Sequence, residues 1–269
     1  MINQDIEWYY NRGREQARLE RNCFLEQART QCIIKERLPQ KNCKIADIGG
    51  AAGSYAFWLT WMGHTVTLVD PVELHLQQAK ETMEQTGIQL QDCLQADARD
   101  LPLSDNEYDV VLLLGPLYHL VSESDRIRSL QEAIRILKPR GQLFAAAICR
   151  YGSILDGFFF NSIAKPGFID IMQNDMKTGI HKNKQKEPGM FTTAYFHKPE
   201  QLKHELNTAG FSGIQLLSIE GIFSKIPDLK NKWQDESYRK LLLDTIKLME
   251  TDQSVIGLSS HFMGFAQKP

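Results

Sequence analysis

Short apolar runs alternate with amphipathic segments along the first 150 residues of this 269-residue chain. The runs have the length of buried β-strands, whereas apolar residues three or four positions apart are typical of helices that pack on one side. Helices are predicted over 72–83 and 127–137, and Gly87 and Pro139 end them. This alternation predicts an α/β fold with a doubly wound, mostly parallel sheet that binds its ligand at the carboxyl ends of the strands. The predicted strands lie near residues 44–48, 65–69, 90–95, 109–114 and 142–149.

The alternation stops after the fifth predicted strand, and this divides the chain into four parts. Residues 1–40 have a mainly helical pattern, 41–150 form the strand–helix core, 151–198 are an insertion, and 199–269 return to the core with a helical insertion at 228–257. The insertion at 151–198 leaves the sheet at its carboxyl edge, where ligands bind in such folds. We therefore expect two short apolar helices and an aromatic extended segment that together cap the active site.

A glycine-rich turn joins the first predicted strand to the following helix. The strand contains Asp47 and is followed by Gly49, Gly50 and Gly53, and the second strand ends on Asp70. Glycines let the backbone approach a ligand, and an acid at the end of the second strand accepts hydrogen bonds from ribose hydroxyls. The turn therefore predicts a nucleoside-containing cofactor, although its glycine spacing differs from the Gly-x-Gly-x-x-Gly of nicotinamide sites.

Four segments in this order resemble the class I S-adenosylmethionine-dependent methyltransferases. The turn Asp47–Gly53 resembles their first motif, with Ala51 in place of the middle glycine, a mild departure. The other three segments resemble the residues after the third strand, the fourth strand and the turn before the fifth: Gln95–Pro102, Tyr108–Gly115 and Ile136–Phe144. The resemblance implies a Rossmann-like, doubly wound sheet of seven mostly parallel strands, whose terminal antiparallel pair lies near 213–220 and 261–267.

The same resemblance implies S-adenosyl-L-methionine (SAM) as the cofactor. In this family Asp70 corresponds to the acid that binds the ribose hydroxyls, and Asp97 to the acid that receives the adenine amino group. Tyr118 either contacts the methionine part of the cofactor or belongs to the core. Residues 1–40 correspond to a segment that closes over the cofactor in many relatives, but their aromatic residues could equally pack on the core. The expected cofactor-binding residues are Asp47, Gly49, Gly50, Gly53, Asp70, Asp97, Ala98, Gly115 and Tyr118.

The segment Gly115–Leu120 follows the fourth predicted strand, where the family places the reactive methyl group. Methyltransferases of DNA bases and protein glutamine carry Asn or Asp at the position of Gly115, so those activities are disfavoured. The metal-dependent catechol type needs carboxylates nearby, and the first acid is Glu123, so we expect no metal. His119 is the candidate catalytic residue, as a general base or as a residue that orients the substrate, because an imidazole can take a proton near neutral pH. It could equally bond the neighbouring backbone and only shape the pocket.

Three residues of the predicted cap region are candidates for contact with the substrate: Phe159, Tyr195 and His197. Phe159 belongs to an apolar helix, and Tyr195 to the aromatic extended segment. His197 precedes Pro199, which favours the first turn of a helix, so a role at the helix entrance is the alternative.

Composition narrows the partners that the chain could have. A net charge of −2 disfavours a nucleic-acid partner, which usually requires a basic face. The five cysteines form no closely spaced pair and no zinc motif, as expected of reduced thiols in a cytoplasmic protein. The N-terminus does not resemble a signal peptide, and no run is apolar enough to span a membrane. These properties, with the enclosed cap, favour a small-molecule methyl acceptor.

The sequence therefore predicts a SAM-dependent methyltransferase that moves a methyl group to a small molecule by in-line displacement. Two alternatives remain open at this point, a nicotinamide-dependent oxidoreductase and a SAM-binding module without catalytic activity. The later motifs disfavour the first, and only turnover separates the second.

Overall fold

Seven strands form one sheet in the computed structural model of the chain, which describes residues 4–11, 23–39, 42–183 and 190–269. The strand order is β3-β2-β1-β4-β5-β9-β8; β1 to β5 are mutually parallel, and β9 is antiparallel to both of its neighbours. The predicted doubly wound, mostly parallel sheet is thereby confirmed. The strands are β1 (Lys44–Ile48), β2 (Thr65–Asp70), β3 (Asp92–Gln95), β4 (Tyr108–Leu113), β5 (Leu137–Ile148), β8 (Ser212–Ser218) and β9 (His261–Gln267).

Most strand bounds lie within two residues of the prediction, and β5 is the exception. It begins at Leu137, five residues before the predicted start at 142, because Leu137 already pairs with Tyr108 ahead of a register shift in β4. The preceding helix correspondingly ends at Ile136. Pro139 therefore lies within the strand and not after a helix.

Helices cover both faces of the sheet, each with an apolar stripe. One face packs against α3 (Phe24–Arg37), α4 (Ser54–Trp61) and α5 (Glu73–Thr86), and the other against α6 (Pro116–His119), α7 (Glu123–Ile136) and α10 (Pro199–Thr208). Two buried clusters result, one on each side of the strands. Helix α3 belongs to the mainly helical pattern predicted for residues 1–40, of which residues 12–22 lie outside the described part of the chain. The core holds the carboxyl ends of β1, β2 and β4 next to one another.

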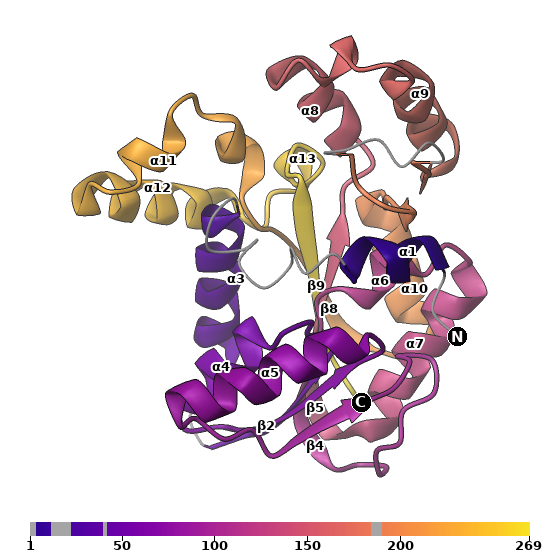
Figure 1. Ribbon diagram of the computed structural model, residues 1–269, viewed down its shortest axis with the longest axis vertical. Helices are drawn as coiled ribbons and strands as arrows, with labels where there is room; N and C mark the ends of the chain where they lie inside the picture. The colour runs from indigo at the N-terminus through magenta and orange to yellow at the C-terminus, as the bar shows by residue number, and fades with distance from the viewer. Residues whose placement is uncertain (1–3, 12–22, 40–41, 184–189) are drawn as a thin grey trace.

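The insertion between β5 and α10, here called the cap, forms a separate group of short elements (Figure 1). Helices α8 (Gly152–Phe159) and α9 (Phe168–Thr178) contact each other and stand together at one end of the molecule. A 3-10 turn, η1 (Ser162–Ala164), joins them, and a short antiparallel pair follows, β6 (Ile180–His181) with β7 (Ala194–Tyr195). The two apolar helices expected from the sequence are therefore present, and the extended segment is short.

The second insertion lies between β8 and β9. It consists of η2 (Gly221–Lys225), α11 (Leu229–Lys232), α12 (Glu236–Met249) and α13 (Gln253–Ile256). Leu229, Leu242 and Ile246 pack on Leu25 of α3 in a small cluster of their own. Figure 1 shows α11 and α12 beside α3, away from the cap. Among the described helices, none is both long enough and apolar enough to cross a membrane.

At the end of the molecule where the cap lies, the short helix α1 (Gln4–Tyr10) runs between the cap and the core (Figure 1). A hydrogen bond joins α1 to the segment before β7, because the Thr192 hydroxyl donates to the carbonyl of Asp5 at 3.1 Å. The cap and helix α1 thus both lie near the carboxyl edge of the sheet.

Candidate functional site

The turn after β1 has a backbone that most side chains could not adopt. Gly49 has φ +68°, and a Cβ atom there would lie 2.6 Å from Cγ of Pro116, which follows β4. Gly53 has φ +88° and stands immediately before α4. The amide groups of Gly49 and Gly50 both donate to the carbonyl of Val69 on β2. Glycine therefore permits β1, β2 and the loop after β4 to approach one another closely.

Asp70 connects this turn to the end of β2. Its Oδ2 accepts a hydrogen bond from the backbone N–H of Ala51 at 2.9 Å, and its Oδ1 accepts from Val72 N and His75 Nδ1, both at 2.9 Å. Ala51 itself has φ +49°, a left-handed conformation that favours glycine. Alanine at this position is therefore more than a mild departure, and the bond to Asp70 helps to hold it.

Asp47 lies beneath the turn and is almost fully buried, with 1% of its surface exposed. Within the described residues, neither carboxylate oxygen has a partner in good hydrogen-bond geometry, although the backbone N–H of Ala56 lies close enough to oppose the rise of the Asp47 pKa. Burial, and then the nearby negative charge of Asp70, raise the pKa of Asp47 to about 7. A buried carboxylate without a counter-charge is costly, so this position favours a ligand that brings a donor or a positive charge.

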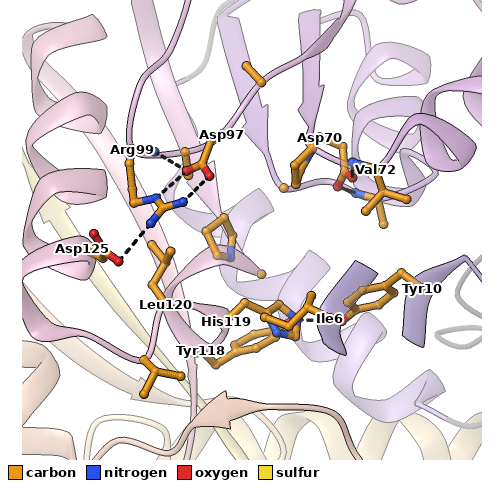
Figure 2. Close-up of a pocket in the computed structure, with 18 of the residues that line it drawn as sticks. Ile6, Tyr10, Asp70, Val72, Asp97, Arg99, Tyr118, His119, Leu120 and Asp125 are labelled. Carbon is orange, nitrogen blue, oxygen red and sulfur yellow. Dashed lines mark hydrogen bonds and ion pairs between the residues drawn. The ribbon is translucent and has the colours of Figure 1, made fainter. Parts of the chain in front are cut away.

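Two cavities meet at the turn. The larger, here called the cofactor cavity, has a volume of about 680 Å³ and is lined by Gly49, Asp70, Ala98, Gly115 and His119 among others (Figure 2). A smaller one of about 60 Å³ lies on the other side of Gly115 and Tyr118, where Asp47, Gly50 and Ser54 line it. The expected cofactor-binding residues are thus gathered at one edge of the sheet, except that Gly53 supports the turn without lining either cavity.

Helix α3 contributes two residues of the smaller cavity that the sequence analysis did not identify, Glu26 and Thr30. Arg29 fixes this part of the helix. It is buried and donates to Glu250 Oε2 at 2.6 Å and to the carbonyl of Ile219 at 3.2 Å. No local motif marks Glu26 or Thr30, because they reach the site through the packing of α3 on the second insertion.

Asp97 lines the cofactor cavity, but Arg99 already occupies much of its carboxylate. Arg99 donates to Asp97 Oδ1 at 2.8 Å and to Oδ2 at 2.6 Å, and it also bonds Asp125 on α7 at 2.9 Å. These hydrogen bonds from Arg99 hold the pKa of Asp97 below its ordinary value. Figure 2 shows the three side chains together on one side of the cavity. The sequence analysis did not identify Arg99 or Asp125, since their pairing depends on the position of α7.

His119 ends the short helix α6 and faces the N-terminal helix. Its Nε2 lies 2.7 Å from the hydroxyl of Tyr10, and the rings of His119 and Tyr118 pack edge to face. Tyr10 and Ile6 of α1 line the cofactor cavity together with His119 (Figure 2). The candidate base is therefore part of the cofactor cavity and is covered by α1.

A third cavity of about 230 Å³, here called the cap cavity, lies between the cap and the ends of β5 and β9. Residues of α8, α9 and β6 line it, together with Ser260 and His261 at the start of β9. Tyr118 lines all three cavities. It therefore marks the place where the cofactor cavity, the smaller cavity and the cap cavity converge.

Three residues predicted to contact the substrate lie elsewhere. His197 is 0% exposed, its Nε2 lies 3.1 Å from Glu205 Oε2, and burial lowers its pKa. Tyr195 is 8% exposed and packs its ring 3.7 Å from the guanidinium carbon of Arg126. Phe159 is 53% exposed on α8 and does not line these cavities. The placement does not support a substrate contact for any of the three, because two are enclosed in a polar network around α10 and one faces solvent.

The described residues contain no group of three or more His, Cys, Asp or Glu side chains that could hold a metal ion. The polar side chains that line the cavities can instead form hydrogen bonds with an organic ligand. This arrangement has the chemistry of a nucleoside-binding site with a separate, partly aromatic pocket beside it.

Comparisons with known proteins agree with this geometry. A family described as a methyltransferase domain matches residues 46–145. The demethylmenaquinone methyltransferase of Staphylococcus saprophyticus is 30% identical over 193 residues, which are 70% of this chain and 78% of that protein. The glycine/sarcosine/dimethylglycine N-methyltransferase of Actinopolyspora halophila is 30% identical over 135 residues, 46% of this chain but only 23% of that longer protein.

The fold has relatives among solved structures. A SAM-dependent methyltransferase from Methanosarcina mazei superposes with a TM-score of 0.59 at 16% identity, covering 88% of this chain and 96% of that one. The motifs, the sheet order and the similarity over most of the Staphylococcus enzyme point to the same family. This chain belongs to the class I SAM-dependent methyltransferases.

Proposed function

We propose that the protein transfers a methyl group from SAM to a small-molecule acceptor, with the cofactor lying along the carboxyl edge of the sheet from Asp97 to Asp47. The observation that carries this proposal is the turn after β1, which is held open by glycine, bonded to Asp70 and bordered by a cavity of about 680 Å³. A cavity of this size suits a cofactor of nucleoside and amino-acid parts.

The residues around the cavity fit SAM on physical grounds. Gly49 and Gly115 leave room where a side chain would collide, since a Cβ at Gly115 would lie 3.0 Å from the carbonyl oxygen of Gly49. The oxygens of Asp47 have no partner in good hydrogen-bond geometry among the described residues and are suited to the cofactor's ammonium group. Asp70 has one lone pair left on Oδ2 for a ribose hydroxyl. Asp97 can accept from the adenine amino group while it also accepts from Arg99.

When bound, SAM supplies an electrophilic methyl group on a sulfonium, and the protein must align the acceptor with it and exclude water. The narrow wall formed by Gly115 and Tyr118 is where the cavities meet, so it is the place for this alignment. His119 stays our candidate for the residue that takes or orients the acceptor's proton. Because the Tyr10 hydroxyl occupies its Nε2, a base role would pass through that hydroxyl or require it to move.

We propose that α1 covers the bound cofactor and that the cap covers the acceptor. Ile6 and Tyr10 lie over the cofactor cavity as a lid would, and the cap encloses the neighbouring cavity at 151–198. A small acceptor fits this enclosure, whereas a nucleic acid would need a broad basic face, and the chain carries a net charge of −2. The five free cysteines suit a reducing, cytoplasmic compartment.

Calorimetry with SAM and its demethylated product S-adenosylhomocysteine tests the proposal. Both compounds should bind, whereas NAD and NADP should not. Asp70→Ala should weaken SAM binding by roughly 1–3 kcal/mol, because the turn loses its acceptor and the ribose loses its partner. Asp92→Ala is the matched control, an exposed acid at the start of the neighbouring strand β3. Tight binding of NAD without binding of SAM would refute the assignment.

A further inference from the structure

The cap cavity contains an imidazole that its surroundings hold in one orientation. His181 is 5% exposed and lines the cavity, and its ring stacks on Phe196 with 4.9 Å between centroids and 16° between planes. Its Nδ1 lies 2.8 Å from Oδ2 of Asp175, which is completely buried on α9. The same oxygen accepts from the hydroxyl of Ser153 on α8. The ring is therefore locked by stacking on one side and by a carboxylate at one edge.

This orientation fixes what the other ring nitrogen can do. Since Nδ1 donates its proton to Asp175, Nε2 of the neutral ring is an acceptor. Nε2 is buried and has no partner among the described residues, and the same is true of Oγ of Ser260, which lines the same cavity. Buried polar atoms of this kind nearly always meet a partner. Because both atoms belong to residues that border the cap cavity, a ligand bound there that displaces the side chains slightly is a candidate for that partner.

A second imidazole on the opposite element is held in the same way. His261 opens β9, pairs with Ile148 at the end of β5 and lines the cap cavity. Its Nδ1 lies 2.9 Å from Oε1 of Glu220, and its backbone N–H donates to the same oxygen at 3.0 Å. The cap and the sheet thus each present a carboxylate-held histidine to one cavity.

The remaining lining decides the class of ligand. Its apolar part comes from five side chains of the sheet edge and the cap: Ile148, Phe168, Met190, Phe191 and Phe196. The lining acid Asp156 is paired with Lys225, and Lys165 is exposed to solvent, so the described lining offers no unpaired carboxylate for a cation. A dry apolar cavity of about 150 Å³ holds benzene, so a cavity of about 230 Å³ holds a ring with substituents.

We propose that the cap cavity binds the methyl acceptor as an uncharged aromatic ring that carries at least one hydroxyl group, with that hydroxyl donating to Nε2 of His181. The apolar side chains enclose the ring, and Ser260 bonds a further polar substituent. Tyr118, which lines this cavity and the cofactor cavity, contacts the ring on the side of the cofactor. This assignment rests on the proposed function, because it identifies the cavity as the acceptor site of that methyltransferase.

The test compares three small probes on the full-length protein loaded with S-adenosylhomocysteine, by calorimetry or ligand-observed NMR. The probes are p-cresol, 4-methylanisole, in which a methyl group caps the same hydroxyl, and benzylamine, which is a cation. We expect p-cresol to bind about three- to tenfold more tightly than 4-methylanisole, the range of one buried hydrogen bond. Benzylamine should bind least. Equal binding of p-cresol and 4-methylanisole, stronger binding of benzylamine, or no binding of any probe would overturn the proposal.

Variants of His181 locate the contact. In His181→Asn the shorter amide can still donate to Asp175 but has no equivalent of Nε2, so the preference for p-cresol should disappear. His181→Gln, whose amide reaches toward the Nε2 position, should keep part of it. His204→Asn, at an exposed histidine of α10, is the matched control and should change nothing. An unchanged preference in His181→Asn would refute the contact.

Two further measurements keep the outcome interpretable. Thermal unfolding shows whether the His181 variants fold, and if they do not, Met190→Trp should fill the cavity and exclude p-cresol while leaving the buried polar group intact. Affinity for S-adenosylhomocysteine should be unchanged in every variant. If the wild-type protein did not bind S-adenosylhomocysteine, the proposed function would fail, whereas a failure of p-cresol alone would refute only the acceptor class.

Discussion

The end of the site that we assign to the cofactor and the end that we assign to the acceptor are built in different ways. At the cofactor end, the backbone amides of the turn after β1 are bonded to Val69 on β2, and Gly49 and Gly115 leave space where a side chain would collide. At the end assigned to the acceptor, the cap cavity is lined by the imidazoles of β6 and β9, by serine hydroxyls, and by aromatic rings of α9 and of the segment that flanks β7. The shape of the first end depends on the course of the main chain, whereas the second can be changed by substituting side chains. We therefore expect substitutions at the two ends to affect different measured quantities.

The strongest test of this division is at His119, which lines the cofactor cavity next to Tyr118, the residue that the cavities share. Removal of a general base typically costs about 10²–10⁴-fold in rate. With an acceptor in hand, His119→Asn should lower turnover by such a factor and change SAM affinity little. If proton removal is its role, the loss should shrink at high pH, where the acceptor ionises without help.

Tyr10→Phe separates orientation from proton transfer, because it removes the hydroxyl that lies 2.7 Å from Nε2 and leaves the ring in place. It should lower turnover less than His119→Asn does. His64→Asn is the control, because His64 bonds the backbone N–H of Cys43 and does not line the cavities. A fully active His119→Asn enzyme would return His119 to a purely structural role.

At the cofactor end the largest effect should come from Gly49→Ala. The new methyl group would collide with Pro116 and stand in a left-handed backbone. Overpacking costs about 1–3 kcal/mol and the left-handed conformation about 1–2 kcal/mol, so the turn should move away from Pro116 and SAM binding should fall by about thirtyfold or more. Calorimetry measures the affinity, and thermal unfolding measures the stability.

Gly87→Ala is the matched control for strain without collision. Gly87 has φ +73° at the end of α5, and a Cβ there would meet no atom within 4 Å. It should reduce stability by about 1 kcal/mol and leave SAM affinity unchanged. Similar losses of affinity in the two variants would mean that the close approach of the turn to Pro116 has no role in binding.

The contrast between the two ends also explains what the sequence could predict. The sheet, the turn and the acid of β2 follow from local signals, namely apolar runs, glycines and an aspartate at a strand end. The pairing of Asp97 with Arg99 and Asp125 does not, because it depends on where α7 packs. Glu26 and Thr30 likewise reach the smaller cavity only through the docking of α3.

At the acceptor end, the sequence identified the segment but not its residues. The end of the strand–helix alternation predicted an insertion at 151–198. Tyr195 and His197, which were candidates for substrate contact there, are buried around α10. His181 and His261 are 80 positions apart, and no sequence motif links them. Their carboxylate partners, Asp175 and Glu220, become visible only when the helices and strands are in place.

A smaller effect is expected at Asp47, whose pKa of about 7 is raised by burial and by Asp70. Because the folded protein holds this proton more tightly than the unfolded chain, Asp47 makes the ligand-free protein less stable as pH rises from about 4 to 7. Asp47→Asn should therefore raise the melting temperature more at pH 8 than at pH 4. A cationic ligand group favours the ionised acid, so SAM binding should release a proton from Asp47 near pH 6.

Calorimetry of SAM binding in buffers with different ionisation enthalpies measures that proton. The number released should fall to near zero in Asp47→Asn, and the wild-type affinity should rise with pH by up to about tenfold per unit below pH 7. Asp92→Asn, at the exposed end of β3, should leave both quantities unchanged. Proton uptake in place of release would show that Asp47 stays protonated in the complex and does not meet a cation.

The smallest expected effect is at Ala51, which stands in the turn at φ +49°. Ala51→Gly removes a left-handed penalty of about 1–2 kcal/mol, but it also makes the unfolded chain more flexible, which costs about 0.4–1 kcal/mol. The net result should be a gain in stability of up to about 1 kcal/mol, measured by chemical unfolding. The hydrogen bond from residue 51 to Asp70 involves the backbone and is kept, so SAM affinity should change less than threefold. Loss of stability in Ala51→Gly would mean that the methyl group of Ala51 packs favourably in the turn, and the main-chain character of the cofactor end would then be incomplete.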